Sequence, residues 1–385
     1  MKHYSHLNTA ELILTQYDGT QPFGLFIKDF FKADKKYGSK DRKRITALCY
    51  GYFRLGKIAW QIPVRERILL GLFLACTEPD ALLEMEKPEW KANTGMSIEE
   101  KLQFAGHDFS PADLFPAVPE ISPLVDHQRF VLSHFLQPDL FLRVRPGKED
   151  LVKVSLSDAG ISFELISPNC LALPNASKLD GVVNINRDAV IQDYSSQRVI
   201  ELLNDIPDFS PKTVWDCCAA SGGKSLLIYD RYPGIQLTVS DVRENILANL
   251  HKRFREAGIR QYRSFAADLS KPVKQHGSFD LIVTDVPCTG SGTWGRTPEQ
   301  LVFFDVQKID EYASRQRQII LNSWKQLRPG GYFLYITCSV YKQENEEAVA
   351  FATEHTKLKL INSSLFQGYS QRADTLFAAL FQYEV

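Results

Sequence analysis

The sequence lacks the features that mark membrane, secreted and low-complexity proteins. Its 385 residues contain no apolar run near the roughly 18 residues that a membrane-spanning helix needs. The polar start MKHYSHLNTAELILTQYDGT has no hydrophobic segment of the signal-peptide kind. No internal repeat or low-complexity tract occurs, and 44% hydrophobic with 24% charged residues is typical of folded domains. We therefore expect a cytoplasmic protein with no membrane partner.

Cysteine is scarce, and its spacing is uninformative for metals or disulfides. The seven cysteines are odd in number, and no two of them form a CxxC pair. This argues against both a disulfide framework and a zinc ribbon, so we expect no bound metal. Any cysteine with a function is then expected to act as a free thiol.

Net charge is nearly absent as well, and a value of −1 taken alone argues against a nucleic-acid-binding protein. The average hides a segregation of charge along the chain. Residues 28–57 include ten basic and three acidic residues, whereas residues 61–126 include five basic and twelve acidic ones. Two solvated helix faces of opposite sign are one interpretation, and a basic surface that contacts phosphates is the other. The basic residues that carry the second interpretation are Lys40, Arg42, Lys43 and Arg44.

The spacing of apolar residues divides the chain into three predicted domains. Residues 1–136 show the three- and four-residue spacing of amphipathic helices, which predicts a helix bundle. Residues 137–190 contain short alternating runs separated by glycine and proline, which predicts a small α+β connecting module. From 191 to 385, apolar strands alternate with helices, which predicts a doubly wound parallel sheet.

In such sheets, ligands bind at the carboxyl ends of the strands. Four predicted strands carry an acid at this end: Asp216, Asp241, Asp268 and Asp285. Gly222 and Gly223 let the backbone of the first strand and its helix approach a ligand closely. The following GKS is similar to a phosphate loop, but that motif needs glycine where this chain has Cys218. Acids without a phosphate-binding glycine pattern favour a positively charged cofactor that lacks phosphates, such as S-adenosylmethionine.

Two cysteines follow neighbouring predicted strands: Cys288, in the segment DVPCTGSG, and Cys338, in the segment TCS. A methylase that acts on carbon 5 of cytosine needs a thiolate, because addition of sulfur to carbon 6 makes carbon 5 nucleophilic. A carboxyl group at ring N3 would stabilise the charge that develops. The second cysteine would assist release. The chemistry alone leaves open which cysteine attacks, because DNA cytosine methylases use the proline–cysteine site.

At these residues the chain resembles the Sun-type RNA cytosine-C5 methyltransferases, bacterial members of which modify small-subunit ribosomal RNA. Three segments are similar to the cofactor loop and to the two cysteine motifs of that family: DCCAASGGK (216–224), DVPCTGSGTWGRTPE (285–299) and YITCSVYKQENEEAV (335–349). Residues 39–57 resemble its NusB-like helical domain, and LFLRVRP (140–146) resembles its connecting module. QDYSSQ (192–197) resembles the segment that opens its catalytic domain, and DTLFAALFQ (374–382) resembles its closing strand.

The resemblance implies an α/β fold with a Rossmann-like methyltransferase sheet, preceded by an all-helical NusB-like domain and a small α+β module. It implies Cys338 as the nucleophile, Cys288 as the release cysteine and Asp285 over N3 of the base. Lys224 would pair with Asp285 or with the cofactor. The residues that would hold S-adenosylmethionine are Cys218, Ala219, Ala220, Ser221, Gly222, Gly223, Lys224, Asp241, Asp268 and Asp285.

The predicted function is therefore methylation of carbon 5 of cytosine in RNA, with ribosomal RNA as the expected partner and a monomer as the expected state. We expect target specificity in the helical domain and around Arg143 and Arg145. Transfer RNA is an alternative substrate, and a non-catalytic RNA-binding or ribosome-assembly factor is an alternative class. An amino-methylase would show an aromatic residue after a proline pair, where this chain has Val286-Pro287-Cys288. Ser221 replaces the usual proline of the cofactor loop and is expected to loosen that turn.

Overall fold

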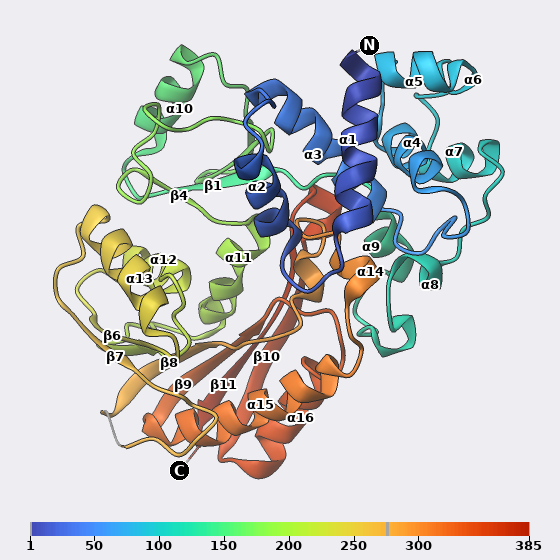
Figure 1. The fold of residues 1–385 in the computed structure, drawn as a ribbon. Helices are drawn as coiled ribbons and strands as arrows, with labels where there is room; N and C mark the ends of the chain where they lie inside the picture. Colours follow the sequence, from blue (N-terminus) through green and yellow to red (C-terminus); the bar gives the residue numbers. More distant parts are fainter. Residues whose placement is uncertain (1, 275–276, 385) are drawn as a thin grey trace. The chain divides into compact units, whose positions relative to one another are not determined.

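A computed structural model describes residues 2–274 and 277–384 (Figure 1). Its contacts divide the chain into two compact units. The first consists of Met1–Ile121, Asp126–Gln137 and Thr293–Val306, and the second of Ser122–Val125, Pro138–Gly292 and Gln307–Val385. Within the described ranges, no helix has the length and apolar character needed to cross a membrane.

The first unit is helical, as the spacing of its apolar residues predicts. Its elements are α1 (Lys2–Gln16), α2 (Phe23–Ala33), α3 (Ser39–Phe53), α4 (Val64–Ala75), α5 (Ala81–Glu86), α6 (Pro88–Lys91), α7 (Ile98–Phe104), α8 (Pro111–Leu114), η1 (Val118–Glu120), α9 (His127–Ser133) and α14 (Gln300–Phe303). Helices α3 and α4 touch backbone to backbone, because a Cβ atom on Gly71 would lie 2.4 Å from the carbonyl oxygen of Gly51. Gly71 is therefore required by the packing of these helices, whereas a Cβ atom on Gly51 would lie at an ordinary contact distance of 3.4 Å from Gly71.

One segment of the first unit was expected elsewhere. Thr293–Val306 begins within the first cysteine motif (285–299) and was predicted to lie in the catalytic domain, yet its contacts are with the helices. Trp294 stacks on Phe115 with ring centroids 5.0 Å apart, and Glu299 Oε1 accepts a hydrogen bond from the Phe23 amide at the start of α2. Phe23 and Glu299 are 276 residues apart in the sequence, so the hydrogen bond between them produces no local pattern. The same holds for the aromatic stacking, and the spacing of apolar residues therefore could not predict either contact.

The second unit contains the connecting module and the large sheet together. Its elements are β1 (Leu140–Val144), α10 (Glu149–Asp158), β2 (Glu164–Ser167), β3 (Cys170–Leu173), β4 (Ala189–Ile191), α11 (Tyr194–Arg198), η2 (Val199–Asp205), β5 (Thr213–Asp216), α12 (Gly223–Arg231), β6 (Gln236–Asp241), α13 (Glu244–Glu256), β7 (Tyr262–Ala266), β8 (Phe279–Asp285), η3 (Ser291–Thr293), α15 (Lys308–Ser323), η4 (Trp324–Gln326), β9 (Leu327–Thr337), α16 (Glu346–His355), β10 (Leu358–Gln367), η5 (Gly368–Gln371) and β11 (Thr375–Tyr383). The module is a four-stranded antiparallel sheet of order β2-β3-β1-β4. It was predicted as a domain of its own over 137–190, but it belongs to the same compact unit as the large sheet.

The large sheet has seven strands in the order β10-β11-β9-β8-β5-β6-β7. Strands β7, β6, β5, β8 and β9 are parallel, as predicted, whereas β11 pairs antiparallel with both β9 and β10. The sheet is therefore mixed and not wholly parallel. The order of the strands reverses at β5, and this reversal creates the crevice where ligands of open α/β sheets bind.

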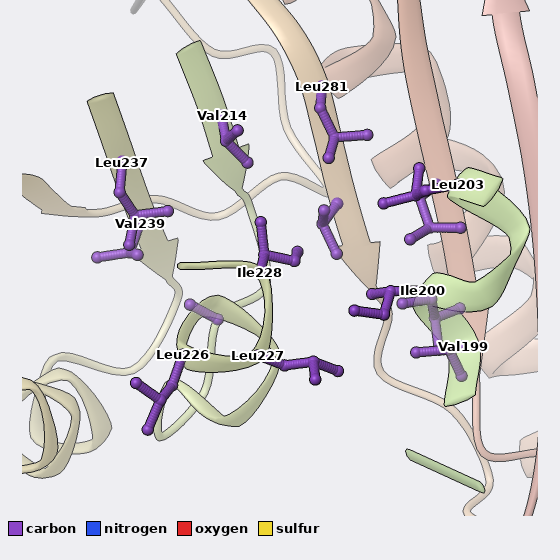
Figure 2. Close-up of a cluster of buried hydrophobic side chains, with 14 of the residues drawn as sticks. Val199, Ile200, Leu203, Val214, Leu226, Leu227, Ile228, Leu237, Val239 and Leu281 are labelled. Carbon is purple, nitrogen blue, oxygen red and sulfur yellow. The ribbon is translucent and has the colours of Figure 1, made fainter. Parts of the chain in front are cut away.

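Buried side chains cover both faces of this sheet, which explains why its strands are continuous apolar runs. On one face, Val214, Val239 and Leu281 meet side chains of η2 and α12, as Figure 2 shows. On the other, Trp215 and Ile282 pack in a cluster that includes residues of α15 and α16. Residues adjacent in sequence, such as Val214 and Trp215, thus face opposite layers, and the register of each strand is determined by two cores.

Candidate active site

The two predicted catalytic cysteines meet at the carboxyl ends of β8 and β9. The two strands are parallel neighbours, with Asp285 in register with Ile336, so the loops that follow them start side by side. Cys288 Sγ and Cys338 Sγ lie 3.2 Å apart. The amide of Gly292 donates to the carbonyl of Cys338 at 2.8 Å, which closes one loop onto the other. The prediction that these thiols lie together is confirmed.

Lys224 and Asp285 form an ion pair next to the thiols. Lys224, in the first turn of α12, donates to Asp285 Oδ2 at 2.9 Å. Burial opposes the charge of Lys224, but the charge of Asp285, its hydrogen bond and then the charge of Cys338 outweigh burial and raise the pKa of Lys224. Of the two partners that the sequence left open for Lys224, the structure shows Asp285.

The predicted cofactor loop connects β5 to α12 in a constrained conformation. Gly222 has φ +84°, and a Cβ atom there would lie 2.8 Å from the Phe254 ring, so only glycine fits. Ala220 also has a positive φ of +44°, and its amide donates to Asp241 Oδ2 at 3.0 Å. Ser221, expected to loosen the turn, accepts a hydrogen bond from Arg253 Nη1 at 3.2 Å. The loop thus has a side-chain tie at the position where proline was expected.

The other predicted cofactor acids differ in how far they are engaged. Asp241, at the end of β6, is buried and also accepts from the amide and Nε of Arg243. Asp268 accepts from the amide and hydroxyl of Ser270, and these bonds, the hydroxyl's foremost, lower its pKa. Within the described ranges, no group of three or more His, Cys, Asp or Glu side chains could hold a metal ion.

Asp216, at the end of β5, has a buried oxygen aimed at no protein donor. Its side chain is fully buried, and Oδ2 accepts from the Ser225 hydroxyl. Oδ1 has no hydrogen-bond partner within the described part of the chain. A buried carboxylate oxygen without a partner is costly, so its presence at a ligand-binding strand end indicates a bound group that donates to it.

Asp216→Asn is expected to flatten the pH dependence of stability. Burial raises the pKa of Asp216 from its ordinary value of 3.8 to about 7. The folded protein then holds a proton that the unfolded chain releases, so this contribution to stability is full below about pH 4 and is lost as the pH rises through about 7. Urea denaturation of both proteins between about pH 4 and pH 8 measures the difference. Asp268→Asn is the control: the lowered pKa of this carboxyl keeps it ionised in both states across nearly all of this range, so the slope should not change. Equal slopes for wild type and Asp216→Asn would contradict the assignment.

Comparison with known proteins assigns the chain to a family. A model described as 16S rRNA methyltransferase RsmB/F matches residues 207–378. Ribosomal RNA small subunit methyltransferase B of Sodalis glossinidius is 31% identical over 362 residues, which cover 82% of this chain and 82% of that protein. This chain belongs to the RsmB/F methyltransferase family. The corresponding protein of Xanthomonas campestris is 32% identical over 194 residues, and that match spans 48% of this chain and 44% of that protein.

Solved structures show that the RsmB/F-family fold is shared more widely. The crystal structure of PH0851 superimposes with a TM-score of 0.71 at 19% identity and covers 99% of this chain and 98% of that chain. NSun6 from Pyrococcus horikoshii with SFG gives a TM-score of 0.58 at 15% identity, over 71% of this chain and 96% of that one. At these identities the likeness establishes the Rossmann-like methyltransferase fold alone. The resemblance to Sun-type enzymes expected from the sequence motifs is confirmed by the family match.

The basic residues predicted to bind RNA in this RsmB/F-family chain fall into two groups. Lys40 and Lys43 are exposed on α3. Arg42 and Arg44 are partly buried: Arg42 Nε donates to the Tyr37 carbonyl, and Arg44 pairs with Asp80 at 2.6 Å. The two lysines therefore remain available to phosphates, and the two arginines have partners within the helical unit.

Arg143 and Arg145 were predicted to contribute to RNA recognition, but the structure gives them a shared partner in helix α12, Asp230. Arg143 Nη1 lies 2.6 Å from Asp230 Oδ2, and Arg145 Nη2 lies 2.7 Å from Asp230 Oδ1. Arg143 is 2% exposed, so its side chain is closed to a phosphate. The RNA contact expected of Arg143 stays a prediction. Arg145 also donates to the Ala257 carbonyl, so both arginines attach the module to α12 and α13.

Two further residues support the site without having been predicted. Gln192 accepts from Arg143 Nε and donates to the carbonyl of Gly223, so the segment before α11 steadies the start of α12. Glu344 is completely buried and accepts hydrogen bonds from Thr289 and Ser339, one residue beyond each cysteine. Glu344 lies within the second cysteine motif (335–349), but its partners are revealed only by the fold.

Proposed function

We propose that this chain methylates carbon 5 of cytosine in RNA, with S-adenosylmethionine as the methyl donor and ribosomal RNA as the substrate. It would act as a cytoplasmic monomer and without a metal ion. The observation that carries the proposal is the thiol pair Cys288 and Cys338, 3.2 Å apart, beside the ion pair of Lys224 with Asp285. Methylation of an amino group needs neither thiol, whereas a pyrimidine carbon needs a covalent nucleophile.

The electrostatic surroundings favour Cys338 as that nucleophile. The thiol of Cys338 is close enough to Lys224 to contribute to the raised pKa of the ammonium group, and this cation stabilises a thiolate at Cys338 in return. Cys288 has the opposite surroundings, because its hydrogen bond to Cys338, its burial and then the charges of Cys338 and Glu344 raise its pKa. The raised pKa of Cys288 and the position of Lys224 therefore both favour Cys338 as the attacking thiol.

The chain's own groups would act in sequence on the target base. Cys338 Sγ forms a bond to carbon 6, and the electron pair of the ring double bond becomes available at carbon 5, while Asp285 interacts with N3. S-adenosylmethionine, when bound, supplies an electrophilic methyl group. A base then takes the proton from carbon 5, the double bond returns, and the bond between Cys338 and carbon 6 breaks with the assistance of Cys288.

The residues at the carboxyl end of β5 fit that cofactor. The unpartnered oxygen of Asp216 is an acceptor for a cationic or amino group, and Gly222 leaves the backbone open to close approach. We propose that the loop that includes Lys224 holds the cofactor together with Asp241, Asp268 and Asp285. The proposed loop residues are Cys218, Ala219, Ala220, Ser221, Gly222, Gly223 and Lys224.

Bisulfite sequencing of total RNA from cells with and without the gene tests the function directly. A cytosine in small-subunit ribosomal RNA that loses protection when the gene is removed is the expected result. Loss of protection in a transfer RNA would keep the chemistry and change the substrate. Unchanged protection at every cytosine would contradict the proposal and favour a non-catalytic RNA-binding factor on the same fold.

The exposed lysines of α3 provide a separate test of RNA binding. Lys40→Glu with Lys43→Glu is expected to make the fall of log affinity with log salt less steep. The magnitude of the slope should decrease by about 1.5, because each phosphate contact contributes roughly 0.7 to 0.9. Filter binding of ribosomal RNA between about 50 and 200 mM salt measures the slope. Lys359→Glu, which alters an exposed lysine of β10, is the matched control. An unchanged slope in the double variant would show that these lysines form only a solvated face.

A further inference from the structure

A single buried carboxylate joins the two loops that carry the cysteines. Glu344 lies between β9 and α16 and has no exposed surface. Its Oε1 accepts from the Thr289 amide at 2.9 Å and from Gln316 Nε2 at 2.9 Å. Its Oε2 accepts from the Thr289 hydroxyl at 2.6 Å and from the Ser339 hydroxyl. Four donors thus use the acceptor positions of one carboxylate.

These donors lie directly beside the reactive groups. Thr289 follows Cys288, and Ser339 follows Cys338, so each thiol is one residue from a hydrogen bond to Glu344. Gln316 extends the connection, because its Nε2 also donates to the carbonyl of Pro287, the residue before Cys288. The Glu344 carboxylate therefore contacts both loops, and through Gln316 it supports the first loop on each side of its cysteine.

Other bonds fasten Glu344 itself and the same two loops. The Tyr335 hydroxyl donates to the Glu344 carbonyl at 2.7 Å and to Gln316 Oε1 at 3.0 Å. The Ser291 hydroxyl accepts from the Val340 amide at 2.9 Å, which adds a direct bond between the loops. Glu344 is thus held by Tyr335 of β9 through its backbone carbonyl and holds the two cysteine loops through its carboxylate, an arrangement that fixes the geometry of a site.

We propose that Glu344 is a positioning residue that holds Cys288 against Cys338 and, through its negative charge, keeps the proton on Cys288. The catalytic importance of this role rests on the proposed function. The position and protonation of the two thiols, however, can be measured in the protein without RNA or cofactor. Burial of Glu344 raises its own pKa, and the hydrogen bonds from Ser339 and Thr289 oppose that shift. The donors are the reason that a buried carboxylate can carry charge here.

The charge and the hydrogen bonds of Glu344 can be separated by substitution. In Glu344→Gln, the amide oxygen can accept from the Thr289 amide and Gln316, and the amide nitrogen can donate to the Thr289 and Ser339 hydroxyls once these rotate. This variant keeps the tie and removes the charge. Glu344→Ala removes both, and Glu347→Gln is the matched control, because Glu347 is half-exposed on α16 and 3.7 Å from Arg317.

The spacing of the thiols can be measured without RNA or cofactor. Diamide takes two electrons from a pair of thiols and is reduced to the hydrazine while a disulfide forms, so the rate of cross-linking between Cys288 and Cys338 reports their proximity. We expect wild type, Glu344→Gln and Glu347→Gln to cross-link at similar rates and Glu344→Ala to be slower by about tenfold or more. Peptide mapping under non-reducing conditions identifies the bond. A folded Glu344→Ala that cross-links at the wild-type rate would overturn the positioning role, and if Glu344→Ala does not fold, Ser339→Ala takes its place.

The effect of the Glu344 charge can be measured separately, through the pH at which Cys288 ionises. A purely structural role of Glu344 would leave this pH unchanged. Alkylation of Cys288 by iodoacetamide, followed by mass spectrometry across a range of pH, gives the pH at which this thiol ionises. Loss of the neighbouring negative charge in Glu344→Gln is expected to lower that pH by roughly one unit, with Glu347→Gln unchanged. No shift would overturn the electrostatic part of the proposal. Failure of RNA methylation in wild type, with both thiol results intact, would count against the proposed function and leave the role of Glu344 standing.

Discussion

Cys288→Ala is expected to accumulate a covalent protein–RNA adduct, whereas Cys338→Ala is expected to abolish methylation and trap no RNA. The thiolate that forms the bond to carbon 6 is proposed at Cys338, next to Lys224, and the thiol that assists release is proposed at Cys288. Without Cys288, the bond between Cys338 and carbon 6 would still form, but it would break only slowly. Without Cys338, this bond would never form. A denaturing gel of protein incubated with labelled RNA and S-adenosylmethionine separates the adduct from free RNA.

The adduct experiment has a direct control in a cysteine outside the site. Cys76 lies in the helical unit and is only partly buried, so Cys76→Ala should methylate at the wild-type rate and trap no RNA. Methylation by the Cys338 variant is expected to fall below detection, because the covalent route supplies the whole activation of carbon 5. An adduct with Cys338→Ala and none with Cys288→Ala would reverse the two roles.

Asp230→Ala is expected to lower the free energy of unfolding by about 3–5 kcal/mol, the cost of breaking a buried ion pair. Asp230 has a side chain that is 6% exposed and accepts from both Arg143 and Arg145. Burial lowers the pKa of Arg143, and the charge of Asp230 and its hydrogen bond oppose that shift. Removal of Asp230 leaves the buried guanidinium without its counter-ion. Urea denaturation measures the loss.

A surface pair provides the contrast for Asp230. Glu201 pairs with Arg198 at 3.0 Å, and both side chains are more than a third exposed, so Glu201→Ala should cost no more than about 1 kcal/mol. Replacement of Arg143 by Met together with Asp230 by Leu should recover part of the loss, because well-packed apolar residues often match a buried ion pair. A loss in Asp230→Ala no larger than that in Glu201→Ala would contradict the assignment of Asp230 as the anchor of the connecting module.

The strands of the large sheet were predictable because each one is buried on both faces. Asp241 and Asp285 were expected to end two of these strands, and they are the last residues of β6 and β8. A continuous apolar run bounded by turn residues is a local property, and burial on two faces imposes it. The antiparallel edge of β10 and β11 had no such marker, because a strand's direction depends on its partner and not on its own composition.

By itself, the sequence determined the helical first part, the alternation of strands and helices, and the meeting of Cys288 with Cys338 at neighbouring strand ends. These follow from local periodicity and from the rule that parallel strands end at one edge of the sheet. Only the tertiary structure decided the partner of Lys224, the burial of Arg143, the attachment of Thr293–Val306 to the helices and the central place of Glu344. In each of these cases the deciding contact joins residues far apart in the chain. A charged or polar side chain has the same local pattern whether it faces solvent or a buried partner, so folding alone distinguishes the two.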